Sequence, residues 1–178
     1  MNLNELRDDI IIKQKKGLPF IITSVIIWLL IAIVSTLDLN IELKNILIFC
    51  CSCPLLPISW LVGKKLNVDI FSNENELGKL GFLFTMNQML YLLIVMWVFN
   101  AVPEKMTMVY AMVFGAHLLP YSWLYKSNSY KFFAIAIPII SLVLGIFFNG
   151  FVVAAVLAVT EFIFVLLLFN ELKRIPKS

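Results

Sequence analysis

Six long apolar runs constrain this chain more than any other feature of its sequence. They cover residues 18–36, 44–63, 80–99, 106–125, 132–148 and 151–169. A bilayer core about 30 Å thick requires roughly 20 mostly apolar residues in a helix. The runs therefore predict an all-α, polytopic membrane protein with six transmembrane helices in one domain, residues 18–169. The segments between and beside them are too short for a soluble domain, so any activity must reside in or at the membrane.

The composition excludes the other broad classes. Hydrophobic residues make up 61% of the chain and charged residues 14%, whereas a soluble domain carries about a quarter charged residues. A soluble globular protein, a disordered chain and a disulfide scaffold are all excluded. The net charge of +3 predicts no nucleic-acid partner, because the basic residues only border the apolar runs.

The basic residues predict the orientation of the six helices. Twelve Lys and Arg residues fall on one side of a six-span topology, and only Lys44 and Lys105 fall on the other. Such an asymmetry is typical of cytoplasmic loops. It predicts a multi-pass protein of the plasma membrane with both termini, the loop at 64–79 and a short tail at 170–178 in the cytoplasm.

The first 17 residues resemble a short amphipathic helix that precedes the first span. Asn2 and Glu5 have the spacing of a capping box, and Gly17 with Pro19 would end the helix. Its apolar side is formed at helical spacing by Leu3, Leu6 and Ile10. We expect it to lie on the inner leaflet with its lysines near anionic headgroups. The alternative is that this segment only determines the topology.

The sequence contains an internal repeat with an offset of 63 residues. Residues 55–61 (LLPISWL) recur as 118–124 (LLPYSWL), and residues 28–31 (WLLI) match 91–94 (YLLI) at the same offset. The first two helical hairpins are thus predicted to superpose by rotation about an axis near the membrane normal, as in parallel-repeat transporters. A third copy near residue 166 is weaker. The alternative is that hairpin duplication simply builds a six-helix bundle.

Glu161 is the only carboxylate deep within a predicted span. An acid at this depth is costly, so such residues usually face a bundle interior and have a function. Ala154 and Ala158 share its helical face and would permit close helix approach. The residue is either part of a site or a protonated side chain that holds two helices together.

Four further polar residues form the rest of the predicted site. His117, the only histidine, and Asn87 and Gln88 fall within roughly 5 Å of Glu161 in depth at 1.5 Å per residue, and Tyr121 flanks His117 at helical spacing. We expect them to meet as a ligand- or ion-binding cluster. The alternative is a lone histidine bonded to a backbone carbonyl.

A metal site is a less favoured alternative. Cys50 and Cys53 lie one helical turn apart, and with His117 they would suit a soft metal such as Cu(I). A second cysteine pair is missing, however, and cysteine is a common apolar filler. No cofactor is predicted. The sequence also lacks the hydrolase, zinc-protease and phosphate-loop motifs, so we do not expect an enzyme.

The opening segment resembles a family of small, uncharacterised bacterial membrane proteins. The resemblance covers Leu6 to Trp28, with Lys15-Lys16-Gly17-Leu18-Pro19-Phe20 at its centre, and it implies no activity. In length, span number and cytoplasmic termini the chain is also similar to the substrate-binding membrane subunits of vitamin-uptake transporters. It lacks their A-x-x-x-A pattern on the first span and has it only at Ala154 and Ala158, so this likeness concerns the fold alone.

Two functions remain open from the sequence. One is a transporter, or a membrane substrate-binding subunit, for a small solute or ion. The other is a non-transporting scaffold, assembly or stress-related partner protein. Its partners would be the lipid bilayer together with a small solute or ion, or another membrane protein, or further copies of the chain. A solvated cavity at the polar cluster would favour transport, and a closed bundle would favour the scaffold.

Overall fold

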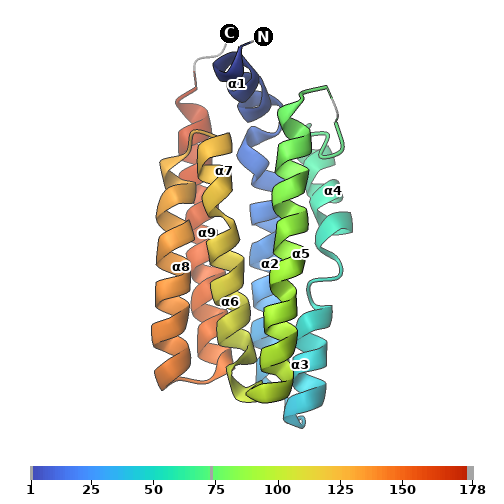
Figure 1. Cartoon of the computed structure of the whole chain (residues 1–178), viewed down its shortest axis with the longest axis vertical. Coiled ribbons are helices and arrows are strands. Elements are labelled where there is room, and N and C mark those ends of the chain that lie inside the picture. Colours follow the sequence, from blue (N-terminus) through green and yellow to red (C-terminus); the bar gives the residue numbers. More distant parts are fainter. Residues whose placement is uncertain (1, 73, 176–178) are drawn as a thin grey trace.

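The computed structural model describes residues 2–72 and 74–175, and helices form all the regular secondary structure within them. The long helices run side by side as one bundle, and both ends of the chain lie at the same end of it (Figure 1). We call this end the terminal end and the opposite one the far end. The helices are α1 (Leu3–Lys13), α2 (Leu18–Thr36), α3 (Ile41–Cys50), α4 (Leu55–Leu66), α5 (Leu77–Ala101), α6 (Met106–His117), α7 (Leu119–Leu124), α8 (Asn128–Phe147) and α9 (Gly150–Lys173), with short 3-10 turns at Lys15–Gly17 and Pro103–Lys105.

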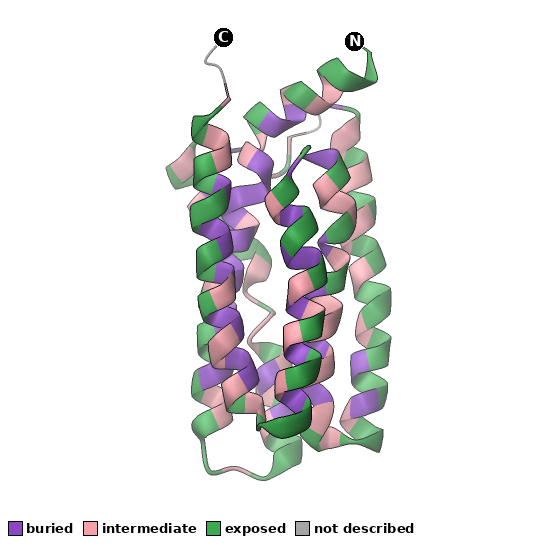
Figure 2. Cartoon of the chain, turned by 90° about the vertical axis from the view of Figure 1, so that its left-hand side faces the viewer, coloured by how far each residue is buried: buried purple, intermediate pink, exposed green. Residues whose placement is uncertain are grey.

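α2 is the central helix of the bundle. It packs most extensively against α9 and also against α4, while α6 packs against α8, and α5 packs against α6. Buried residues line the inner faces of the helices, whereas their outer faces are exposed along the whole length of the bundle (Figure 2). Those outer faces are apolar, as the exposed side chains of Phe132, Phe147 and Val159 illustrate. An apolar exterior of this extent is what contact with lipid requires.

Five helical stretches are long and apolar enough to cross a membrane: Lys15–Thr36, Ile41–Leu66, Leu77–Ala101, Asn128–Phe147 and Gly150–Lys173. The structure thus contains several helices with the length and hydropathy that a membrane span requires.

The fourth predicted span, 106–125, is not one continuous helix, because α6 ends at His117 and α7 begins at Leu119. Pro120 has no N–H, and its ring clashes with the preceding turn, so an unbroken helix is not favoured here. The six-span topology remains a prediction.

The second predicted span, 44–63, is also interrupted, at the site of the three cysteines. α3 ends at Cys50, a turn occupies residues 51–54, and α4 begins at Leu55. Pro54 and Pro57 account for the break in the same way. The two copies of the repeated sequence thus each begin a helix directly after an interruption, α4 at Leu55 and α7 at Leu119. The rotation that would relate the two hairpins remains a prediction.

α1 begins with the predicted capping box. The backbone N–H of Glu5 donates to Asn2 Oδ1 at 3.0 Å, and the backbone N–H of Asn2 donates to Glu5 Oε2 at 2.9 Å. Gly17 and Pro19 lie where the sequence predicted the end of the segment, with Pro19 in the first turn of α2.

α1 is attached to the bundle and lies across its terminal end. The Arg7 guanidinium donates to the Trp123 carbonyl and lies 4.6 Å from the centre of the Trp123 ring. Lys126 Nζ is 2.5 Å from Asp8 Oδ1, and Asn75 Nδ2 donates to the Leu6 carbonyl at 2.8 Å. These contacts join α1 to α7, to Lys126 just after α7, and to Asn75 just before α5. The helix therefore closes the terminal end in addition to any contact it makes with lipid.

A left-handed turn joins α1 to α2. Lys15, Lys16 and Gly17 have φ of 45°, 54° and 67°, and only glycine adopts this region without cost. A Cβ on Gly17 would lie 3.1 Å from Tyr130 Oη and 3.3 Å from a Tyr125 ring carbon. The turn thus requires glycine both for its backbone conformation and for its packing.

We expect Gly17→Ala to lower the free energy of unfolding by about 1–2 kcal/mol, the cost of placing an L side chain in the left-handed region. Thermal unfolding of the purified protein in detergent measures this loss. Gly78→Ala is the matched control, because its Cβ would meet only the Ser72 carbonyl, at 3.5 Å. Equal stabilities of the two variants would contradict the assigned role of Gly17.

Candidate functional site

Glu161 lies in the centre of the bundle, at the contact between α9 and α2. Its side chain is completely buried, and Ser24 of α2 bonds its Oε2 at 2.6 Å. Ala154 and Ala158 on the same face of α9 are buried too, and small residues of this kind let two helices approach closely. The predicted position of Glu161 in the bundle interior therefore agrees with the structure, and its partner is Ser24.

The second carboxyl oxygen of Glu161 has no hydrogen-bond partner among the described residues, although it is buried. Buried polar atoms are paired in the great majority of cases, so each exception requires an explanation such as a bound water, an ion or a functional role. A carboxyl group that served only to join two helices would be expected to have both oxygens paired. The unpaired Oε1 therefore distinguishes Glu161 from an ordinary structural contact.

Ser24 makes two contacts with one hydroxyl group. Its Oγ lies 2.7 Å from the Ile21 carbonyl oxygen and 2.6 Å from Glu161 Oε2. A hydroxyl has a single hydrogen to donate and two lone pairs that accept. Since a carbonyl can only accept, the Ser24 hydrogen serves either Ile21 or Glu161 at any moment.

A second polar contact lies beside this pair on α2. Ser59 of α4 donates to Thr23 Oγ1 at 3.0 Å, and Thr23 donates to the Pro19 carbonyl at 2.8 Å. Both side chains are fully buried, and in this chain of bonds each hydroxyl hydrogen has its own acceptor. Consecutive residues of α2 therefore join it to α4 on one side and to α9 on the other.

His117 and Tyr121 meet each other but not Glu161. The His117 ring donates through Nδ1 to the Phe114 carbonyl and lies edge-on to the Tyr121 ring, with centres 6.0 Å apart. Tyr121 Oη contacts Thr85 Oγ1 at 2.8 Å and donates to the Gly81 carbonyl at 3.1 Å. The histidine thus has the backbone partner that the alternative interpretation expected.

Asn87 and Gln88 lie on α5, away from the bundle centre. Asn87 is exposed and donates to Tyr91 Oη at 2.8 Å, and Gln88 is half-buried. No hydrogen bond in the described structure joins Glu161 to His117, Asn87 or Gln88. The expected cluster is therefore not assembled, because equal depth along the membrane normal does not determine which face of a helix a residue occupies.

The proposed metal ligands are also dispersed. Cys50 and Cys53 are exposed and free, and within residues 2–72 and 74–175 no three His, Cys, Asp or Glu side chains form a group that could hold a metal. The interruption at residues 51–54 takes the two cysteines off a common helical face. The geometry thus provides no support for the copper alternative.

A buried ion pair at the terminal end escaped the sequence analysis. Lys16 Nζ lies 2.5 Å from Glu171 Oε2, and Lys16 is only 5% exposed. Ser127 donates to the same carboxylate oxygen at 2.7 Å, and Ser129 donates to the other at 2.7 Å. The pair joins the start of α2 to the end of α9. Its residues are far apart in the sequence, and as border charges they indicated only orientation.

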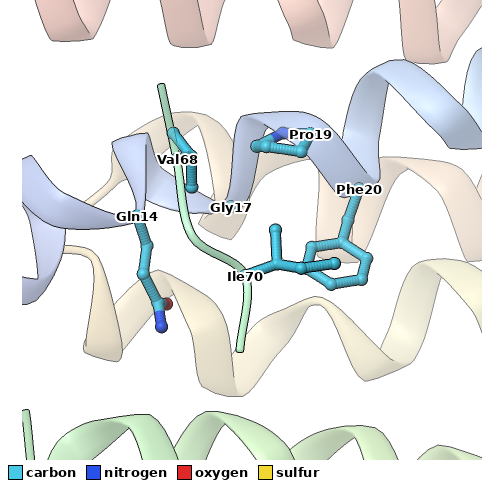
Figure 3. A pocket seen from close by; sticks show the side chains of 6 residues that line it. All are labelled: Gln14, Gly17, Pro19, Phe20, Val68 and Ile70. Atoms are coloured by element: carbon cyan, nitrogen blue, oxygen red, sulfur yellow. The ribbon is translucent and has the colours of Figure 1, made fainter. Parts of the chain in front are cut away.

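A small crevice lies beside this ion pair, where residues 67–71 cross the beginning of α2 (Figure 3). It has a volume of about 30 Å³, enough for about two water molecules. Glu161 does not line it. The lining residues are Gln14, Gly17, Pro19, Phe20, Val68 and Ile70.

An all-α bundle with several membrane-length helices, an apolar exterior and a buried carboxyl defines a helical membrane protein. The chain belongs to the family of unknown function DUF7010, whose family model matches residues 3–171. This confirms the resemblance to an uncharacterised family. Neither a curated protein nor a solved structure matches the chain.

Proposed function

We propose that Glu161 is a proton-binding group inside the membrane and that the protein couples its protonation to the movement of a small solute or ion. The observation that carries the proposal is the completely buried carboxyl group with one oxygen on Ser24 and the other unpaired. Intramembrane acids that face a bundle interior are typical of proton relays in pumps and transporters.

The Ser24 contacts fit a carboxyl group that binds and releases a proton. With Glu161 protonated, the acid donates to Ser24 Oγ while the Ser24 hydrogen remains on the Ile21 carbonyl. With Glu161 ionised, rotation of the Ser24 hydroxyl lets it donate to Oε2 across the same 2.6 Å contact. Both protonation states can therefore be bonded without movement of either helix, which lowers the barrier to exchange.

Infrared spectroscopy of the reconstituted protein tests the first part of this proposal. Glu161 is the only acid deep within a span, so a carbonyl band of a protonated carboxyl that changes after a pH jump should be lost in Glu161→Gln. Glu104→Gln is the control, because Glu104 is an exposed acid in the turn Pro103–Lys105, and this variant should retain the band. A band that is absent, or that Glu161→Gln leaves intact, would show that Glu161 does not exchange a proton.

Proteoliposomes with an internal pH dye test the second part. We expect an imposed ion or solute gradient to drive proton movement with the native chain and with Glu104→Gln, but not with Glu161→Gln. The amide preserves the shape of the side chain and can still bond Ser24, so loss of transport without loss of thermal stability indicates a role for ionisation.

The alternative function is a non-transporting scaffold, and one observation favours it. Glu161 is enclosed in the most extensive helix contact, and the crevice at the beginning of α2 does not reach it. If the protein is a scaffold, Glu161→Gln should behave nearly as the native chain does in both assays. Glu161→Leu should instead destabilise the bundle, because it leaves Ser24 with no partner on α9.

We also propose that the terminal end of the bundle faces the cytoplasm, as the twelve basic residues indicate. The measurement is labelling of single cysteines in intact cells, after the three native cysteines are replaced by alanine. An impermeant reagent should label Asp38→Cys, which lies between α2 and α3 at the far end, and should leave Asp69→Cys unlabelled. The reverse pattern would contradict the proposed orientation, and labelling of both would contradict a membrane crossing between residues 38 and 69.

A further inference from the structure

One helix of the bundle leaves a continuous face without a partner. Six residues at helical spacing on α5 are exposed, although the helix lies against α6 on its other side. Leu90 near the middle of the face is 64% exposed. We call this surface the α5 face; it consists of Phe82, Met86, Asn87, Leu90, Tyr91 and Ile94.

The α5 face has polar groups where lipid would otherwise lie. Asn87 is ten residues from the first residue of α5, about 15 Å along the helix, and so lies well inside a bilayer about 30 Å thick. In the described part of the chain its one side-chain hydrogen bond is to Tyr91 Oη. The amide oxygen and the second amide hydrogen are left exposed, and unpaired polar groups in hydrocarbon are costly.

The predicted internal repeat pairs each residue of this face with a residue of α2. At the 63-residue offset, the six positions correspond to Pro19, Thr23, Ser24, Ile27, Trp28 and Ile31 of α2, and all six are buried in the bundle. Asn87 corresponds to Ser24, the residue that contacts Glu161 of α9. α5 therefore exposes the face that its counterpart buries, and the described chain supplies no helix to cover it.

We infer that a second copy of this chain covers the α5 face, giving a symmetric dimer about a two-fold axis along the membrane normal. The chemistry of the six side chains favours a second copy of the chain as the partner. Its six residues carry no charge that would attract a charged partner, and an amide is both donor and acceptor. On a two-fold axis, each Asn87 donates its free N–H to the amide oxygen of the other, which satisfies both exposed groups. Asparagine bonds across helices in membranes in this way, and dimers with self-complementary faces are the commonest oligomers.

Disulfide cross-linking in native membranes tests this arrangement directly. In a background with Cys50, Cys51 and Cys53 replaced by alanine, Leu90→Cys should form a species of twice the chain mass on mild oxidation. Val159→Cys is the matched control, since it is 61% exposed and lies at similar depth on α9. Cross-linking of both variants, or of Val159→Cys alone, would overturn the dimer. So would an adduct of Leu90→Cys with another mass, which would indicate a different partner protein.

The strength of association tests the role of Asn87. Fluorescence energy transfer between labelled copies, diluted with lipid, should show a dissociation constant raised about 3- to 30-fold in Asn87→Leu, the range expected for one interhelical polar contact. Gln88→Leu, a substitution of a half-buried polar residue on the same helix that is not part of the α5 face, should leave it unchanged. A chain that is monomeric at every dilution, or an Asn87→Leu variant that associates as strongly as the native chain, would contradict the inference. Neither experiment involves proton movement, so the inference stands or falls independently of the proposed function.

Discussion

Gly115→Ala is expected to force α6 and α8 apart and to be among the most damaging single substitutions in the bundle. A Cβ at this position would lie 2.5 Å from Ile137 Cγ2 and 2.6 Å from Pro138 Cδ. These atoms belong to a β-branched side chain and a ring closed on the backbone, so they cannot rotate out of the way. We expect the free energy of unfolding to fall by about 3 kcal/mol, the upper part of the range for overpacked cores.

Unfolding by a denaturing detergent, monitored by circular dichroism, measures this effect. Gly81→Ala is the matched control on α5, where the new Cβ would meet only Leu124 Cδ2, at 3.5 Å. Since alanine favours a helix over glycine by about 1 kcal/mol, the control should be neutral or slightly stabilising. If Gly115→Ala were as stable as Gly81→Ala, the close packing of α6 on α8 would be wrong.

Lys16→Met is expected to destabilise the terminal end of the bundle. It leaves the Glu171 carboxylate with only the Ser127 and Ser129 donors and removes the charge 2.5 Å from it. Breaking a buried ion pair by removal of one partner costs 3–5 kcal/mol. Because the Glu171 side chain is about one-fifth exposed, solvent screens part of this loss, and we expect about 2–3 kcal/mol.

The comparison with a surface ion pair makes this prediction specific. Lys13 also lies near carboxylates, 3.2 Å from Asp9 and 3.1 Å from Glu74, but its side chain is 42% exposed. Exposed pairs contribute little to stability, so Lys13→Met should unfold nearly as the native protein does. If the two substitutions lowered the free energy of unfolding equally, the burial of Lys16 would contribute nothing to the stability of the protein.

The class of protein could be predicted because hydrophobicity is a property of each residue. Apolar runs of the length of a bilayer have few folded solutions other than membrane helices, and the capping box at Asn2 depends on residues three apart. The interruptions near Pro57 and Pro120 also have a local cause. The apolar runs nevertheless predicted a continuous helix across each of these prolines, and the structure has separate helices on either side of them.

The candidate site was predictable only in part. Burial of Glu161 followed from the cost of an acid in lipid, and Ala154 and Ala158 indicated which face of its helix would meet a neighbour. Its partner Ser24 did not stand out, because serine in a span bonds its own backbone readily and carries no signal of a tertiary contact.

The class of helical membrane protein, the burial of Glu161 and the capped start of α1 could all be predicted from the amino-acid sequence. Those outcomes follow from the free energy of transferring single side chains and from bonds within a few residues. Only the tertiary structure decided that Glu161 meets Ser24 rather than His117, that Lys16 pairs with Glu171, and that Asn87 faces outward. Each of these contacts depends on how one helix is rotated relative to its neighbour. That rotation is set by the packing of many side chains at once, so no periodic pattern in the sequence reveals it.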